Sequence, residues 1–140
     1  MVGWRERIPE GYSVQPIDIV LARELQDLLV AAGNEPWFDN LWGSVEGFVE
    51  NGFGFVAIGP GGIASNSRAC WIKDGVAPIQ VSTRGFARSR GLGAAVCFAF
   101  IEHCQAIGLM PSYSCESENL ASIALAGKLG FRESGCNPTR

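Results

Sequence analysis

Charge is scarce in this sequence, and its balance excludes one large class of proteins. Only 18% of the 140 residues are charged, and the net charge is −3. Nucleic-acid-binding modules are normally basic, with clustered Lys and Arg, so we expect no nucleic-acid partner. The basic residues are scattered except for Arg84, Arg88 and Arg90, which lie close together. A local basic segment in an acidic chain favours a small anionic ligand over a polyanion.

Paired cysteines and a second histidine are also missing. The five cysteines form neither an even set nor a Cys-x-x-Cys pair, so neither a disulfide framework nor a zinc site is predicted. Cys97 and Cys104 have helical spacing inside an apolar run. We therefore expect buried thiols in a reducing compartment, and no metal. His103 is the sole histidine, and its place late in an expected helix indicates a surface or half-buried role.

Long hydrophobic runs are absent as well. The longest apolar stretch, 92–101, has about ten residues, whereas a membrane-spanning helix needs about 20. The first residues, Met-Val-Gly-Trp-Arg-Glu-Arg, lack the apolar core of a secretory signal. We expect a cytoplasmic protein without membrane contact. A length of 140 residues fits a single domain, 1–140, and there is no internal repeat or linker.

The hydrophobic pattern predicts an α/β chain with a mixed sheet. Antiparallel strands come first and a strand–helix–strand unit follows, so we expect about six strands with helices on both faces. An Asp-Gly pair at Asp74 favours a hairpin turn. The expected elements, in order, are a strand at 12–19, a helix at 20–32, a loop at 34–42, a short helix capped by Ser44 at 44–49, strands at 53–58, 63–72 and 78–83, a helix at 91–107, a strand at 112–115, a helix at 118–129 and a strand at 131–136.

The most informative segment is 79–95, IQVSTRGFARSRGLGAA, which predicts a strand, a basic loop and a buried helix. Gly91 and Gly93 let the backbone approach a ligand, and the new helix offers unpaired N–H groups and a positive dipole end. Together they predict an anion site, most naturally for a pyrophosphate. The alternative is a glycine that only eases a tight strand–helix turn. A dinucleotide-binding fingerprint would need a third glycine where Val96 stands, and no P-loop Lys-Ser/Thr pair follows.

A second segment is informative together with the first. It covers residues 115–131 and reads CESENLASIALAGKLGF. Together the two segments resemble the GNAT acetyltransferase superfamily. The first family pattern fits Arg88-Ser89-Arg90-Gly91-Leu92-Gly93, and the second fits Asn119 with Lys128-Leu129-Gly130-Phe131. The form around Asn119, with Trp42-Gly43-Ser44 and the Gly-Phe-Gly-Phe run at 52–55, is similar to the zwittermicin-resistance-type subgroup. Members of that subgroup often carry an additional N-terminal half, so this chain corresponds to the C-terminal GNAT half.

The resemblance implies a GNAT-like fold that binds acetyl-CoA, in three sets of contacts. The end of the strand before the loop would meet the pantetheine arm, the loop would hold the pyrophosphate through backbone N–H groups, and the next strand–helix junction would line the pantetheine from the other side. For Asn119 the alternative is helix capping. These sets are, in the same order, Val81, Ser82 and Thr83; Arg88, Ser89, Arg90, Gly91, Leu92, Gly93 and Ala94; and Asn119 with Ser122.

The catalytic pattern departs from that of many superfamily members. A tyrosine that serves as general acid is expected seven residues after Asn119, where this chain has Ala126. Relatives often place a glutamate on the strand before the loop, where the candidate positions here are Pro78, Gln80 and Ser82. Tyr113 and Glu116 are the candidate catalytic residues nearest in sequence, with Cys115 between them; a structural role is the alternative for each.

The acceptor would lie against the first two helices and the connection between them. The candidate acceptor-binding residues there are Trp37, Phe38 and Trp42. The alternative is that they form an aromatic-rich edge of the core. If they line a pocket, they suit an amine with apolar bulk.

The resemblance implies an N-acetyltransferase that moves acetyl from acetyl-CoA to a small-molecule amine by direct attack on the thioester. The alternative is a non-catalytic protein that binds acyl-CoA or sequesters a small molecule. The chain ends soon after the sixth expected strand, so the usual seventh strand is either absent or supplied by a partner in a homodimer.

Overall fold

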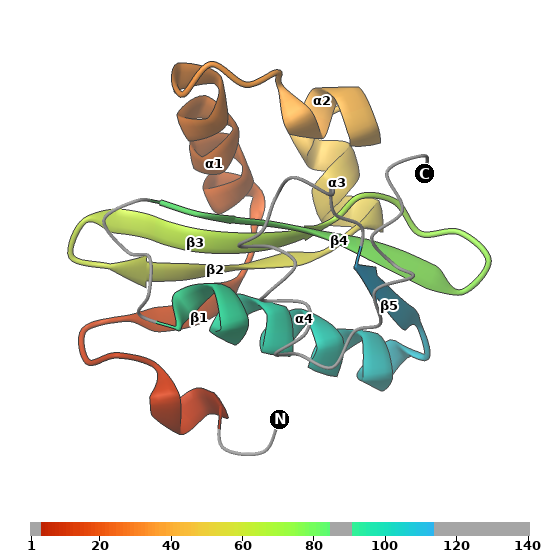
Figure 1. The fold of residues 1–140 in the computed structure, drawn as a ribbon. Coiled ribbons are helices and arrows are strands. Elements are labelled where there is room, and N and C mark those ends of the chain that lie inside the picture. Colours follow the sequence, from red (N-terminus) through yellow and green to blue (C-terminus); the bar gives the residue numbers. More distant parts are fainter. Residues whose placement is uncertain (1–3, 85–90, 114–140) are drawn as a thin grey trace.

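The computed structural model describes residues 4–84 and 91–113, and Figure 1 shows their arrangement. One sheet contains the five described strands, with helices on both faces. The elements are η1 (Trp4–Arg7), β1 (Ser13–Pro16), α1 (Ile19–Ala31), α2 (Trp37–Trp42), α3 (Val45–Asn51), β2 (Gly54–Gly59), β3 (Gly62–Ala69), β4 (Val76–Thr83), α4 (Leu92–Ile107) and β5 (Met110–Tyr113).

The sheet has the order β1-β2-β3-β4-β5. The first four strands pair in antiparallel fashion, and β4 pairs with β5 in parallel. Helices α1, α2 and α3 lie on one face, here called the α1 face, and α4 lies across the other, the α4 face (Figure 1). The predicted mixed sheet with helices on both faces is confirmed, with five strands in the described residues against about six expected.

Local sequence signals place several element ends where they were predicted. Asp74 and Gly75 have φ values of 53° and 77°, the left-handed pair that a tight hairpin turn needs. Backbone hydrogen bonds between Lys73 and Val76 close this turn at 3.0 and 2.9 Å. Ser44 starts α3, since its Oγ accepts a hydrogen bond from the backbone N–H of Gly47 at 2.9 Å.

The first strand is shorter than predicted and the first helix begins earlier. Asp18 is extended, and its Oδ1 accepts a hydrogen bond from the N–H of Leu21 at 2.8 Å. This cap starts α1 at Ile19, so β1 ends at Pro16. The fifth strand begins at Met110, two residues before the predicted start.

The segment 34–42 was predicted to be a loop, and this was wrong for its second half, which forms α2. The local N-cap, Pro36, makes no side-chain hydrogen bond. Instead, Gln26 of α1 reaches across, and its Oε1 accepts hydrogen bonds from the N–H groups of Phe38 (3.0 Å) and Asp39 (3.2 Å). A cap from a neighbouring helix leaves no signal in the segment itself.

The α4 face is closely packed from small and apolar residues. Ala57, Ala64, Ala69 and Ala77 on the strands are fully buried under α4, and Phe100 of α4 is fully buried among them. Small strand residues let the helix approach closely, which gives interiors their crystal-like density. No helix among the described residues has the length and apolarity needed to cross a bilayer. The predicted helix at 118–129 and strand at 131–136 lie outside the described residues.

Candidate active site

The second half of β4 differs from the first in its pairing and its exposure. Described pairing with β5 runs from Val76 to Ile79, which faces Tyr113, whereas pairing with β3 continues to Thr83. Ala77 and Ile79 are buried, but Gln80 is exposed and the next three residues are half-buried. The strand therefore becomes more accessible at Val81, Ser82 and Thr83, the three residues predicted to meet pantetheine.

Hydrogen bonds fix which backbone groups of β4 point away from β3. The carbonyl of Pro78 accepts from the N–H of Cys70 at 2.9 Å, and the N–H of Arg84 donates to the carbonyl of Ala64 at 2.8 Å. Because backbone direction alternates along a strand, the even-numbered residues between them also face β3. Val81 and Thr83 then present their N–H and C=O groups to the opposite edge, where an added strand or an extended ligand would bind.

A hydroxyl pair anchors the end of β4 to β3. Ser65 Oγ lies 2.8 Å from Thr83 Oγ1 and donates to the carbonyl of Ser82 at 3.1 Å. These contacts hold the last strand residues in place just before the segment that leads to α4.

The N-terminus of α4 has no side-chain cap. Gly91 is the N-cap, with a φ of 76°, and it makes no side-chain hydrogen bond. There is no acidic residue in the first turn. The N–H groups of Leu92, Gly93 and Ala94 precede the first intrahelical bond, which Ala95 donates to Gly91 at 3.0 Å. Three unpaired donors at a positive helix end are suited to an anion.

A hydrogen bond from the sheet helps to hold this helix end. Ser67 of β3 is fully buried, and its Oγ donates to the carbonyl of Val96 at 2.9 Å. Leu92 is also buried, with Val96, against Ala57 and Ala64. The backbone N–H groups at the start of α4 therefore belong to a packed helix end.

Two buried polar residues on the α1 face were not predicted. Asn66 and Arg68 of β3 are 4% and 2% exposed. The Oδ1 atom of Asn66 and the Nε and Nη1 atoms of Arg68 are buried and have no hydrogen-bond partner. The only sequence signal was their spacing of two in a strand, which places both on one face.

Arg68 makes two contacts with its surroundings. Its Nη2 donates to Ser82 Oγ at 3.3 Å, and its Cζ lies 4.4 Å from the centre of the Trp37 ring, a cation–π geometry. Burial lowers the pKa of Arg68 to about 10, an effect that nearby Cys70 partly opposes. The guanidinium therefore remains charged at neutral pH.

A cavity of about 240 Å³ lies between α1 and the strands β3 and β4. Apolar side chains of α1 form one wall, and polar residues of β3 and β4 form the other. No Asp or Glu is among its described lining residues. The lining consists of Leu25, Leu28, Leu29, Ala32, Asn34, Ile63, Ala64, Asn66, Ser82, Thr83 and Arg84.

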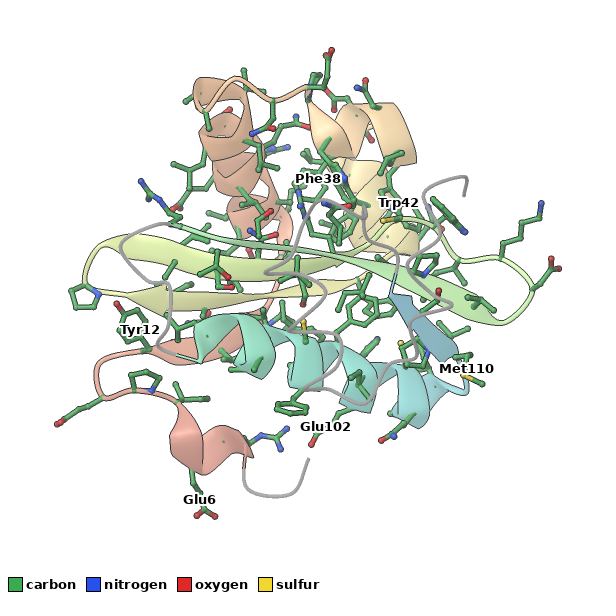
Figure 2. All side chains as sticks on the ribbon, viewed as in Figure 1. Glu6, Tyr12, Phe38, Trp42, Glu102 and Met110 are labelled. Carbon is green, nitrogen blue, oxygen red and sulfur yellow. The ribbon has the colours of Figure 1, made fainter. Side chains whose placement is uncertain are left out.

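The aromatic residues predicted to bind the acceptor lie on this same face, where Figure 2 shows Phe38 and Trp42 near α3. Phe38 is fully buried and packs at 4.7 Å from Phe48, so it belongs to the core. Trp42 is half-buried, and its Nε1 donates to the carbonyl of Ala69 at 2.9 Å. Trp37 is half-buried, and the guanidinium of Arg68 lies over its ring. Phe38 thus fits the alternative of an aromatic core edge.

The remaining predicted site residues fall largely outside the described part of the chain. Arg88, Ser89, Arg90, Glu116, Asn119 and Ser122 all lie outside it. The backbone of Tyr113 pairs with Ile79 at the end of β5. The roles assigned to these residues remain predictions.

The cysteines and the histidine of the described part take no position in the site. Cys70, Cys97 and Cys104 are free and buried, and burial raises the pKa of the Cys70 and Cys104 thiols to about 11. Neutral thiols are poor nucleophiles and poor metal ligands. His103 is half-buried with its ring 4.4 Å from that of Phe53. No cluster of three or more potential metal ligands occurs in residues 4–84 and 91–113.

Two comparisons of sequence point the same way. The model of the GNAT acetyltransferase family matches residues 2–138. The chain is 35% identical over 121 residues to YdfB, an uncharacterized N-acetyltransferase of Bacillus subtilis, and the match covers 84% of this chain and 46% of that protein.

Solved structures show the same architecture. A GCN5-related N-acetyltransferase-like protein from Streptococcus suis matches with a TM-score of 0.72 and 29% identity, over 91% of this chain and 49% of that one. The yncA protein of Salmonella typhimurium, solved with its cofactor acetyl-CoA, matches with a TM-score of 0.66 and 17% identity, over 88% and 80% of the two chains. The latter likeness shows the fold alone. The chain spans about half the length of the B. subtilis and S. suis proteins.

Proposed function

The chain belongs to the GNAT acetyltransferase family, and we propose from this that it transfers acetyl from acetyl-CoA to the amine of a small molecule by direct attack on the thioester. The observation that carries the proposal is that two groups of backbone donors follow each other closely in the chain. The outward-facing edge of β4 ends at Thr83, and the uncapped N-terminus of α4 begins at Gly91.

The cofactor would bind along these two groups. The pantetheine arm carries amide groups, which can pair with Val81 and Thr83 as an added strand would. The pyrophosphate would take the N–H groups of residues 91–94 and the basic side chains of Arg88 and Arg90. Asn119 and Ser122 complete the groove in this proposal, on the basis of the family resemblance.

Acetyl transfer by direct attack needs a neutral amine, a polarised thioester carbonyl and a proton for the departing thiolate. A backbone N–H at the β4 edge is positioned to polarise the carbonyl, and its direction favours Val81 over Ser82. Tyr113 or water would protonate the thiolate, because a phenol with an unperturbed pKa near 10 can give a proton to a thiolate. Glu116 is the proposed base.

The donor role of Val81 can be tested because its N–H takes no part in the pairing with β3. In Val81→Pro the N–H that points away from β3 is lost, while the pairing groups of Ser82 are kept. Losing one such donor in an acyl-transfer site typically lowers kcat about 10²–10³-fold. Val81→Ala is the matched control and should keep kcat within a few-fold. Equal kcat values in both variants would remove Val81 from the mechanism.

The alternative, a non-catalytic acyl-CoA-binding protein, rests on a specific observation. Position 126 is alanine, and no carboxylate lines the cavity among the described residues. Such a protein would bind CoA without turnover.

Release of free CoA thiol from acetyl-CoA, measured over a panel of amines and followed by mass spectrometry of the acetylated product, separates the two functions. We expect thiol release that depends on an amine and is matched by product. Tight CoA binding with no turnover on any amine would refute the enzyme and support the binder. In the enzyme, Tyr113→Phe should lower kcat at least about tenfold if the phenol is the acid, and a loss below about threefold would assign the proton to water.

We also propose a family subgroup and a cellular compartment for the chain. We place the chain with the zwittermicin-resistance-type subgroup on its Trp-Gly-Ser and Gly-Phe-Gly-Phe runs. The three free, buried cysteines fit a reducing compartment such as the cytoplasm.

A further inference from the structure

Arg68 is the most unusual residue in the described part of the chain. It is 2% exposed in a central strand, and two of its three nitrogens have no partner. Its hydrogen bond to Ser82 is long, at 3.3 Å, and the Trp37 ring covers another part of the group. The described residues form two salt bridges, Arg5 with Glu102 and Arg23 with Glu46, and neither of them involves Arg68.

A buried charge without a counter-ion is costly, and folded proteins usually pair such groups. The five N–H donors of a guanidinium form a planar fork that matches a carboxylate. The cation–π contact with Trp37 offsets part of the cost but leaves Nε and Nη1 without acceptors. An anion from outside the chain would supply the missing acceptors.

The neighbouring cavity gives this anion a place. Ser82, which receives the bond from Arg68, lines the cavity, and so does Asn66, whose buried Oδ1 also lacks a partner. Arg68 is not itself among the lining residues and adjoins the cavity through Ser82, whereas Arg84 lines it directly. No Asp or Glu is among the described lining residues. The charge of this wall therefore favours a negative group over a positive one.

The same cavity sets the size and shape of the ligand. Its volume of about 240 Å³ is below the roughly 300–1,000 Å³ typical of drug-sized ligands. Its other wall is built from Leu25, Leu28, Leu29 and Ile63, which suit an apolar group. Ser82 and Thr83, which follow Val81 in the strand proposed to hold pantetheine, also line it, so a bound molecule lies against that strand.

We infer that the acceptor is a small amine bearing a carboxylate and an apolar side chain, with Arg68 binding the carboxylate from behind Ser82 and Asn66 accepting a hydrogen bond from the amine. This rests on the proposed function. The carboxylate replaces Ser82 as the acceptor from Nη2 and also accepts from Nη1, so that it binds the end of the guanidinium fork with both oxygens. The apolar side chain packs on α1.

Matched ligand pairs test the inference on the unaltered protein. Calorimetry, with and without CoA, would compare L-leucine with L-leucinamide and L-phenylalanine with L-phenylalaninamide. Within each pair the side chain and the position of the amine are kept, and the carboxylate is replaced by a neutral amide. We expect the carboxylate to bind at least about 30-fold more tightly in one pair, because an unpaired buried charge costs roughly 2 kcal/mol or more. Equal affinities, or no binding of any probe, would overturn the inference.

Variants assign the preference to Arg68. Arg68→Met should abolish it, and Arg23→Gln, which removes an exposed positive charge from α1, should keep it. If the preference for the carboxylate over the amide survives in Arg68→Met but is lost in Arg84→Gln, the carboxylate binds at Arg84. This result would overturn the role of Arg68. If Arg68→Met does not fold, Arg68→Lys decides: it keeps the charge without the fork, and a loss of about tenfold is expected, whereas no loss contradicts the inference.

The outcomes separate this inference from the proposed function. Amine-dependent thiol release with no carboxylate preference would leave the acetyltransferase standing and remove the acceptor class. If calorimetry shows the preference for the carboxylate but no amine causes thiol release, the proposed acetyl transfer is refuted and the carboxylate site at Arg68 still stands.

Discussion

The two faces of the sheet are covered in different ways although the same strands build both. Under α4, β3 presents Ser67 and Ala69, which are fully buried, and Ser67 Oγ has a partner in the helix. Toward α1, the same strand presents Asn66 and Arg68, which are almost as buried and leave three polar atoms without partners. The β3 hydroxyl under α4 is satisfied within the fold, whereas three side-chain atoms on the α1 face are left without a partner.

The difference indicates where stability and where function reside. Close-packed interiors with every polar atom paired are favourable for folding. Buried polar atoms without partners cost stability and are expected at functional sites. The α4 face therefore fits a scaffold, and the α1 face is where we propose that the acceptor is recognised.

The largest expected effect is on the scaffold face. Phe100 of α4 is fully buried, and its ring lies 4.6 Å from that of Phe53. Phe100→Ala should lower the free energy of unfolding by about 3–5 kcal/mol, because it removes a buried ring and leaves a cavity. Urea unfolding followed by circular dichroism measures this. Ile107→Ala, at an exposed position of the same helix (52%), should change it by less than about 0.5 kcal/mol, and similar losses in both would contradict close packing under α4.

A substitution of Arg68 on the α1 face, in contrast, should not lower the free energy of unfolding. Burial lowers the folded-state pKa of Arg68 to about 10, below the ordinary value of an arginine. Below pH 10 the charge is therefore less favourable in the folded than in the unfolded state, and this cost is relieved as the pH rises above 10. Arg68→Met should therefore leave the free energy of unfolding at pH 7 unchanged or raise it by up to about 2 kcal/mol. A loss above about 1 kcal/mol would make Arg68 a structural residue.

A smaller effect is expected at a helix cap on the α1 face. Ser44 Oγ accepts the N–H of Gly47 at the start of α3. Ser44→Ala should lower the free energy of unfolding by about 1 kcal/mol, and Ser44→Asp, which can still cap, should retain most of the stability. Equal losses in the two variants would show that the hydroxyl contact is not what stabilises α3.

Local signals allowed much of the fold to be predicted from the sequence. The glycines at 91 and 108, which bound α4 with φ values of 76° and 78°, the Ser44 cap and the Asp-Gly turn each act through neighbours in the chain. The helix α2 could not be predicted, because its cap comes from Gln26, twelve residues before Phe38. Proline and glycine around such a segment indicate a loop when only local partners are considered.

The candidate site was also predictable only where local sequence determines it. The strand–loop–helix order and Gly91 follow from local pattern and family resemblance. The importance of Arg68 does not, because an arginine two residues after an asparagine is ordinary in an exposed strand. Its surroundings include Trp37 of α2 and Ser82 of β4, which come together only in the folded chain.

The central claim, that acetyl-CoA binds where β4 leads into the uncapped end of α4, is tested most directly by calorimetry of CoA with two glutamate variants. Gly91 and Gly108 cap opposite ends of α4, both have positive φ, and neither would place a Cβ within 4 Å of other atoms. Gly91→Glu and Gly108→Glu therefore impose the same kind of backbone strain. Only Gly91→Glu also puts a negative charge at the proposed phosphate site. We predict that Gly91→Glu abolishes CoA binding and that Gly108→Glu retains it; unchanged CoA affinity in a folded Gly91→Glu protein would contradict the account.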